Sequence, residues 1–189
     1  DISLAGRIAS QFPELLSDEQ RISDDLAELV QLATTPEALS ERLPLLHSET
    51  GCMITADARL DNREELADKL GVSLTSRIVG DGELIQLSYL RWGRDCPIHL
   101  LGDFAFAIWD ARTQTLLLAR DRNGIKPLYY SQTADRLLFA SNTQALIHAD
   151  DDIDTALDNT ALHHLFTLHA VVPAPNTVIR GIRKVRPAH

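Results

Sequence analysis

The side chains that could act as nucleophiles, bases or metal ligands follow none of the common catalytic patterns. The sequence has no Gly-x-Ser-x-Gly nucleophile elbow. His163 and His164 fall on an amphipathic segment without an acidic partner at the spacing of a zinc site. Residues 80–84 (GDGEL) lack the lysine and spacing of a phosphate loop, and the acidic run 149–154 lacks the later glycine and final glutamate of a calcium loop. These patterns predict neither a metal site nor a nucleotide loop.

The string RDRNGIKPLYY (120–130) is the one polar stretch set between strong strand patterns. Arg120 and Asp121 end one apolar run, and Pro127 fixes the backbone where the next begins. Gly124 permits a left-handed turn. The residues alone leave two interpretations open, part of an active site or a hydrogen-bonded turn between buried strands, and they favour the turn.

Composition narrows the class of protein. The chain of 189 residues is 44% hydrophobic and 24% charged, which is typical of one globular core. A net charge of −9 without a basic stripe argues against a nucleic-acid partner. No apolar run is long enough for a membrane span, and the first residues do not resemble a signal peptide. Cys52 and Cys96 match no metal or redox spacing, so we expect reduced thiols in a cytoplasmic protein.

The hydrophobic periodicity predicts helices layered on antiparallel sheets, an α+β fold. Residues 51–60 read as a strand, and 61–71 as a helix that Asp61 or Asn62 caps and Gly71 ends. The segment LAELVQLAT (26–34) fits a strand or a helix, and Thr35-Pro36 resembles a helix start. The other expected elements are a helix over 81–93, hairpins over 104–121 and 125–142, and helices over 142–148 and 159–170.

Several ordered motifs resemble the glutaminase half of class II glutamine amidotransferases, most closely that of asparagine synthetase and its relatives. Gly102–Ala107 (GDFAFA) matches the family's Gly-x-Phe-Ala-Phe-Ala, Arg120–Tyr129 matches Arg-Asp-x-x-Gly-x-Lys-Pro-Leu-Tyr, and Phe139–Ser141 matches Phe-Ala-Ser. Residues 81–93 resemble the family's Ser-Asp-x-Glu helix, and the last residues resemble the segment that leads to a synthetase domain.

The resemblance implies an N-terminal nucleophile (Ntn) hydrolase fold, an αββα sandwich of two stacked antiparallel sheets between helical layers. Residues 1–175 would be the amidotransferase-like domain, and 176–189 a junction towards an absent C-terminal synthetase domain. In active members an N-terminal cysteine is the nucleophile and its α-amino group the base, a role that its ordinary pKa permits. The released ammonia reaches the synthetase domain, which would use ATP and Mg²⁺. The resemblance implies no cofactor for this chain.

The resemblance also locates departures from the family pattern. Aligned on Ala-Gly, the nucleophile position holds Ile2, which has no nucleophilic atom. Gln31 stands where the family has an arginine that holds the glutamine carboxylate. A glutamine side chain lacks the charged guanidinium group, which can bind a carboxylate through two hydrogen bonds at once. Asp57 and Ala58 occupy the positions of the Asn-Gly oxyanion pair, and a carboxylate there would repel a developing oxyanion. Only Asp81 keeps its family type, at the place that binds the glutamine ammonium.

Three functional hypotheses follow. The first is a degenerate, non-hydrolytic amidotransferase domain that supports a synthetase domain, in an asparagine-synthetase-like ligase or in the Cys-less type seen in lasso peptide cyclases and β-lactam synthetase. The second is an active glutaminase whose Cys-led N-terminus is missing from this sequence. The third is a module that binds an amine or peptide through Asp81. A peptide or small carboxylate would be the parent enzyme's substrate, and a homodimer is a further expectation. The turn that contains Arg120, Asp121 and Gly124 is expected to have a structural role.

Overall fold

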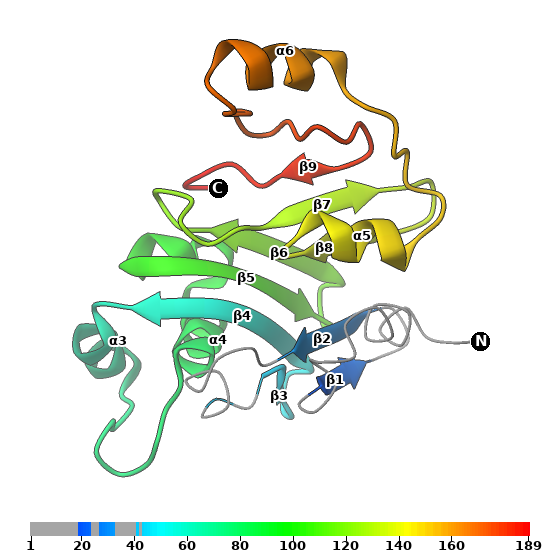
Figure 1. The fold of residues 1–189 in the computed structure, drawn as a ribbon. Helices are drawn as coiled ribbons and strands as arrows, with labels where there is room; N and C mark the ends of the chain where they lie inside the picture. The colour runs from blue at the N-terminus through cyan, green and yellow to red at the C-terminus, as the bar shows by residue number, and fades with distance from the viewer. Residues whose placement is uncertain (1–18, 24–26, 33–40, 42) are drawn as a thin grey trace.

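A computed structural model describes residues 19–23, 27–32, 41 and 43–189 (Figure 1). In chain order the elements are β1 (Glu19–Ser23), β2 (Glu28–Leu32), β3 (Leu45–His47), β4 (Cys52–Leu60), α3 (Arg63–Leu70), α4 (Asp81–Trp92), the 3₁₀ helix η2 (Gly93–His99), β5 (Gly102–Asp110), β6 (Thr115–Arg120), β7 (Tyr129–Gln132), β8 (Leu137–Ala140), α5 (Thr143–Ala149), α6 (Asn159–Thr167) and β9 (Arg183–Lys184).

The first sheet is antiparallel, in the order β3-β4-β5-β6, and α3 and α4 cover one of its faces. Because side chains alternate along a strand, every second residue of β4 and β5 meets these helices. Ile54, Phe104 and Phe106 pack in this way against Leu84 and Ile85 of α4. The alternate residues, including Ala105, lie on the opposite face and contribute to a different cluster. Both faces of β5 are therefore buried.

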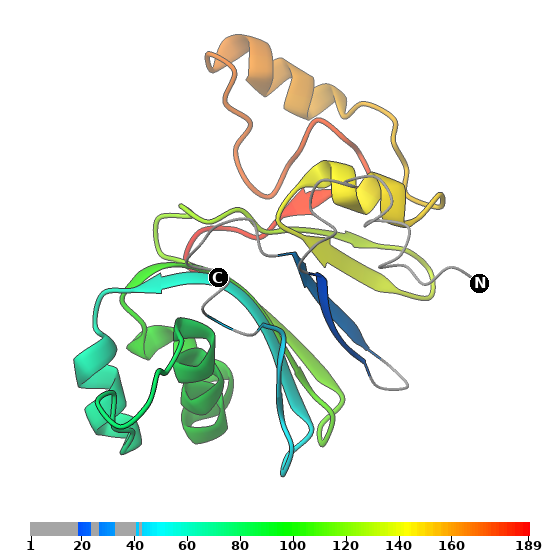
Figure 2. The ribbon, with the colours of Figure 1, turned by 60° about the horizontal axis from the view of Figure 1, so that its bottom comes forward.

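The second sheet has the order β8-β7-β9 and lies against that opposite face (Figure 2). Ala105 of the first sheet packs with Leu128 and Val185, while Tyr130 and Phe139 of the second sheet approach the same cluster. The other face of the second sheet packs against α5 in a third cluster of buried residues, which comprises Leu138, Leu146, Ala149, Ile153 and Ile182. The layer order is helix, sheet, sheet, helix, which confirms the α+β sandwich predicted above.

Both predicted hairpins are present, since β5 pairs with β6 and β7 with β8, antiparallel in each case. Gly71 ends α3 with φ +71, a left-handed conformation that side chains with a Cβ disfavour. Asn62 stands at the predicted N-cap position of α3, but its side chain makes no capping bond to the helix backbone. Its amide instead donates to the His99 carbonyl and accepts from the Leu101 amide, both at 3.0 Å, so Asn62 joins the start of α3 to the segment before β5.

The segment that fits a strand or a helix in sequence forms the strand β2, which pairs antiparallel with β1. Leu29 of this strand is buried, with 1% of its surface exposed. The helix start expected at Thr35-Pro36 lies outside the described residues. Residues 176–189, expected as a junction, supply β9 and a run of hydrogen bonds to the end of β6. Within the described residues, no helix is both long and apolar enough to cross a membrane.

Candidate functional site

The turn after β6 is organised by the guanidinium group of Arg120. Its Nε donates to the Lys126 carbonyl at 2.6 Å, Nη2 to the Gly124 carbonyl at 2.5 Å, and Nη1 to the Val185 carbonyl at 3.0 Å. A planar guanidinium can reach three carbonyls at once, which the point charge of a lysine cannot do with the same geometry. Arg120 therefore joins β6, the turn and the C-terminal segment.

Asp121 holds the same turn from inside. Its carboxylate accepts the backbone N–H groups of Asn123, Ile125 and Lys126 at 2.9–3.0 Å, and only 1% of the residue is exposed. Burial opposes ionisation, but the hydrogen bonds from the backbone N–H groups outweigh it and lower the pKa of the Asp121 carboxyl. The backbone of Asp121 adds bonds from its amide to the Phe104 carbonyl and from the Ala188 amide to its own carbonyl.

Gly124 has φ +66, the left-handed region that the turn requires. A Cβ at this position would lie 2.9 Å from Cγ of Pro187 and 3.1 Å from Cζ of Arg120. The side chains of Arg120 and Asp121 bind backbone atoms of the chain itself, and the space around Gly124 is filled. The turn is thus built as a structural element.

Asp57 lies in the middle of β4, opposite Ala105 of β5. Its carboxylate forms an ion pair with Lys126, with Oδ1 and Nζ 2.6 Å apart, and its side chain is 55% exposed. Ala58 points to the other face of the sheet, where it packs against the core under α3 and α4. The two side chains at the expected oxyanion positions therefore lie on opposite faces, and the carboxylate is held by the lysine of the turn.

Asp81 stands at the start of α4 and its side chain is mostly buried, with 12% exposed. Its Oδ2 accepts the Leu60 amide at 2.9 Å, and its Oδ1 forms an ion pair with Arg63, the first residue of α3. Asp81 thus links the end of β4 to the starts of both helices. The two carboxylate oxygens, which would be needed for an external ammonium group, both have partners within the chain.

The glycines beside Asp81 make room for a second carboxylate. Glu41 accepts the Gly82 amide at 2.5 Å and the Glu83 amide at 3.3 Å, where the positive end of the helix dipole favours an anion. A Cβ at Gly80 would overlap the Glu41 side chain. Burial raises the pKa of Glu41 against the effect of these bonds. The GDG sequence accommodates a carboxylate of the same chain.

The other two predicted site residues are less defined. Ile2 lies outside the described residues. Gln31 lies on β2, paired with Gln20 of β1, and only its backbone is described. The structure links Asp57 to the Arg120–Lys126 turn through Lys126 and places Asp81 on the helical side of the first sheet. Sequence reasoning missed Lys126, Arg63 and Glu41. Lys126 could have been found, because it belongs to the motif that begins at Arg120.

The two cysteines are unsuited to nucleophilic chemistry. Both are free thiols with no exposed surface, in the core between the first sheet and its helices. Burial raises the pKa of Cys52 to about 11 and that of Cys96 to about 12. A reactive cysteine needs the opposite shift, since the thiolate is the nucleophile. Cys52 and Cys96 are therefore core residues.

A comparison with protein-family models matches residues 30–189 to the glutamine amidotransferase domain. The chain belongs to this family. Among its curated relatives, asparagine synthetase [glutamine-hydrolyzing] 3 of Bacillus subtilis (strain 168) is 39% identical over 109 residues, which cover 58% of this chain and 18% of the relative. A putative asparagine synthetase [glutamine-hydrolyzing] of Mycobacterium bovis (strain ATCC BAA-935 / AF2122/97) is 38% identical over 128 residues, 67% of this chain and 19% of the relative.

The matched stretches thus span less than a fifth of these relatives. Among solved structures, a glutamine phosphoribosylpyrophosphate amidotransferase from B. subtilis in complex with ADP and GMP matches with a TM-score of 0.49 and 23% identity, over 65% of this chain and 28% of that one. The family model and the curated relatives confirm the sequence resemblance to an amidotransferase domain of asparagine-synthetase-like proteins at the level of the family.

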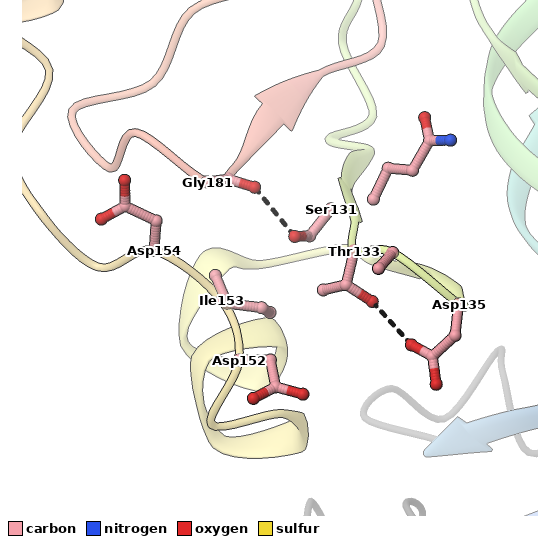
Figure 3. Close-up of a pocket in the computed structure, with 9 residues that line it drawn as sticks. Ser131, Thr133, Asp135, Asp152, Ile153, Asp154 and Gly181 are labelled. Atoms are coloured by element: carbon pink, nitrogen blue, oxygen red, sulfur yellow. Dashed lines mark hydrogen bonds between the residues drawn. The ribbon is translucent and has the colours of Figure 1, made fainter.

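A hollow of about 340 Å³ lies on the amidotransferase domain between the β7–β8 turn and the loop after α5 (Figure 3). Its wall includes Asp135, Asp152 and Asp154 and none of the predicted site residues. Asp135 is paired with Arg136, and Asp154 accepts the Ala156 amide. Within the described part of the chain, no group of three or more His, Cys, Asp or Glu side chains could hold a metal ion. Among the described residues, the hollow is thus lined by a different part of the domain from the one that holds Asp57 and Asp81.

Proposed function

We propose that this chain is a glutaminase-type domain that does not hydrolyse glutamine and that supports the synthetase domain of an asparagine-synthetase-like, ATP-dependent amide-forming ligase. The observation that carries this proposal is Asp57. It stands at the expected position of an oxyanion donor, yet it presents a carboxylate whose partner is Lys126. Oxyanion stabilisation requires hydrogen-bond donors aimed at the developing charge, and an acceptor-only group opposes it.

Two further observations support the loss of glutamine hydrolysis. Asp81, the residue expected to hold the substrate ammonium, is paired with Arg63 and with the Leu60 amide. Gln31, where the family has arginine, lacks a permanent charge for the substrate carboxylate.

The same replacements are the reason for placing the parent with the Cys-less ligases, such as lasso peptide cyclases and β-lactam synthetase. In such enzymes an amine of the substrate replaces ammonia, and a peptide or small carboxylate is activated with ATP and Mg²⁺ in the synthetase domain. The buried thiols suit a cytoplasmic location.

The direct test is release of ammonia from glutamine by the full-length protein. We expect a rate equal to that of buffer, measured with a glutamate-dehydrogenase-coupled assay. The B. subtilis relative described above as glutamine-hydrolyzing is the positive control. Ammonia release above the buffer rate that depends on protein concentration would contradict the proposal.

An active glutaminase whose cysteine precedes Asp1 is the second candidate, favoured by the names of the relatives, which are described as glutamine-hydrolyzing. Treatment of the mature full-length protein with an alkylating glutamine analogue, followed by peptide mass spectrometry, discriminates the two. Cys52 and Cys96 are buried with raised pKa values, so they are expected to stay unlabelled. A label on an N-terminal cysteine would favour this second candidate.

A binding module for amines or peptides is the weakest candidate, because both carboxylate oxygens of Asp81 are engaged within the chain. An amine would have to displace Arg63 from a mostly buried carboxylate. Calorimetric titration with glutamine, arginine and peptides tests this candidate. Heat that disappears in Asp81→Ala would support it.

A further inference from the structure

Helix α6 stands apart from the two sheets, above the loop that returns to β9 (Figures 1 and 2). Of its residues only Ala161 is buried. At its end and in the following loop, three large apolar side chains face solvent: Phe166 is 81% exposed, Leu168 44% and Val171 57%. We call these three residues the α6 surface. A nearly fully exposed phenylalanine is costly in water, and clustered exposed apolar residues are typical of interaction sites.

The charge pattern around the α6 surface is also unusual for a solvent-facing helix. Residues 159–179 contain no Asp, Glu, Lys or Arg, although 24% of the whole chain is charged. A helix that remains in solvent normally carries charged residues on its outer face. A segment with few charged residues and an exposed aromatic side chain has instead the composition that is typical of the buried centre of a protein–protein interface.

The α6 surface is held in place by hydrogen bonds. Asp158 caps the helix through its bond to the Ala161 amide at 2.9 Å, and the Asp158 amide donates to the Val178 carbonyl at 3.0 Å. Nζ of Lys184, on β9, donates to the Val172 carbonyl at 2.7 Å directly after the apolar residues. A surface fixed in this way loses little conformational freedom on binding, which favours association.

We propose that the α6 surface is the docking face for the synthetase domain that accompanies this domain in its relatives. The argument for this occupant is length and position. The matched regions make up 18–19% of those relatives, so most of their polypeptide lies outside this domain. The end of α6 and the C-terminus lie towards the same end of β9 in both ribbon views. The inference rests on the proposed function, in which the synthetase domain is the partner.

Photo-crosslinking in the full-length protein tests the proposal. Phe166→p-benzoylphenylalanine places a reactive aromatic side chain in the α6 surface with little change of shape. We expect irradiation to join position 166 to a residue of the synthetase domain of the same polypeptide, identified by peptide mass spectrometry. Ile78→p-benzoylphenylalanine is the matched control, because Ile78 is also exposed, at 87%, but belongs to the loop before α4. The control is expected to give no such link.

Mixing isotopically light and heavy protein separates links within one polypeptide from links between two copies. Links mainly between copies would overturn the proposal in favour of a dimer contact. Yields no greater than those of the Ile78 control would overturn it in favour of a free surface, and so would a gene product without a synthetase domain. The ammonia assay tests the proposed loss of glutamine hydrolysis, and crosslinking tests the docking of the α6 surface. The two proposals can therefore fail separately, and the experiments show which one has failed.

Discussion

Two carboxylates bind the same lysine in different ways. Asp121 accepts the backbone amide of Lys126 from inside the turn, and Asp57 pairs with its side-chain ammonium from β4. Asp121 is 1% exposed and has further bonds to backbone amides, whereas the Asp57 side chain is 55% exposed with this one ion pair. Bonds from buried carboxylates to backbone are costly to lose, while exposed ion pairs contribute little. Asp121, in the turn after β6, is therefore expected to contribute more to the free energy of unfolding than Asp57, at the expected oxyanion position.

The largest expected effect on stability is that of Asp121→Ala, and it tests the difference between Asp121 and Asp57 directly. The substitution leaves the amides of Asn123, Ile125 and Lys126 without their acceptor, at a position where the carboxylate itself is buried. We expect a loss of about 3–5 kcal/mol in the free energy of unfolding, measured by urea denaturation. Asp57→Ala is the matched control, since it removes a carboxylate that binds the same lysine. Equal losses in the two variants would contradict the comparison.

The contribution of Asp121 to the free energy of unfolding should also depend on pH. Folding lowers the pKa of Asp121 from its ordinary value of 3.8, so its contribution is complete above about pH 4 and is lost as the pH falls through the lower, folded pKa. The pKa of Asp110 is lowered in the same direction, mainly by its hydrogen bond from Arg112. The stability difference between the wild-type protein and Asp121→Asn should therefore shrink below pH 4. A difference that grows on acidification would exclude this account.

A smaller effect is expected for Arg120→Lys. A lysine keeps the charge but cannot bond the carbonyls of Gly124, Lys126 and Val185 together. We expect a loss of about 2–3 kcal/mol. Hydrogen exchange should also accelerate at the Val185 and Ala188 amides, which belong to the bound C-terminal segment. Unchanged exchange there would show that the guanidinium does not anchor this segment.

Asp81→Ala should have an intermediate effect, about 1–2 kcal/mol, because it removes the acceptor of the Leu60 amide and the partner of Arg63 at a mostly buried position. Thermal unfolding of Asp81→Ala, Arg63→Met and the double variant gives the coupling between the two residues. Additive losses would mean that the pair is not energetically linked. Asp81 would then be available to an external ligand.

The smallest effect is expected for Asp57→Asn, which restores the family's amide at the oxyanion position. Stability should change by no more than about 1 kcal/mol, because the ion pair with Lys126 is half-exposed. We expect no ammonia release, because the proposed function also lacks the nucleophile, which an amide donor cannot replace. Release from Asp57→Asn but not from the parent protein would show that Asp57 alone blocks hydrolysis.

The fold was predictable because its signals are local. The patterns along 51–60 and 104–121 predicted the observed strands and the pairing of β5 with β6, and Gly71 ends α3 as expected. Long-range side-chain partners were not predictable. Nothing local shows that the Asn62 side chain bonds His99 and Leu101 instead of its own helix backbone, or that Glu41 bonds the first amides of α4 from 41 residues away. Such choices depend on tertiary geometry, which periodicity does not encode.

The bond from Arg120 to the Val185 carbonyl spans 65 residues of chain. During synthesis at about 5–20 residues per second, the ribosome would deliver Val185 roughly 3–13 s after Arg120. The β5–β6 hairpin can form within that interval, since hairpins need only microseconds, but the guanidinium then has no partner on the C-terminal side. The contacts of residues 185–189 with the end of β6 and with Asp121 therefore form only after both hairpins have been synthesised.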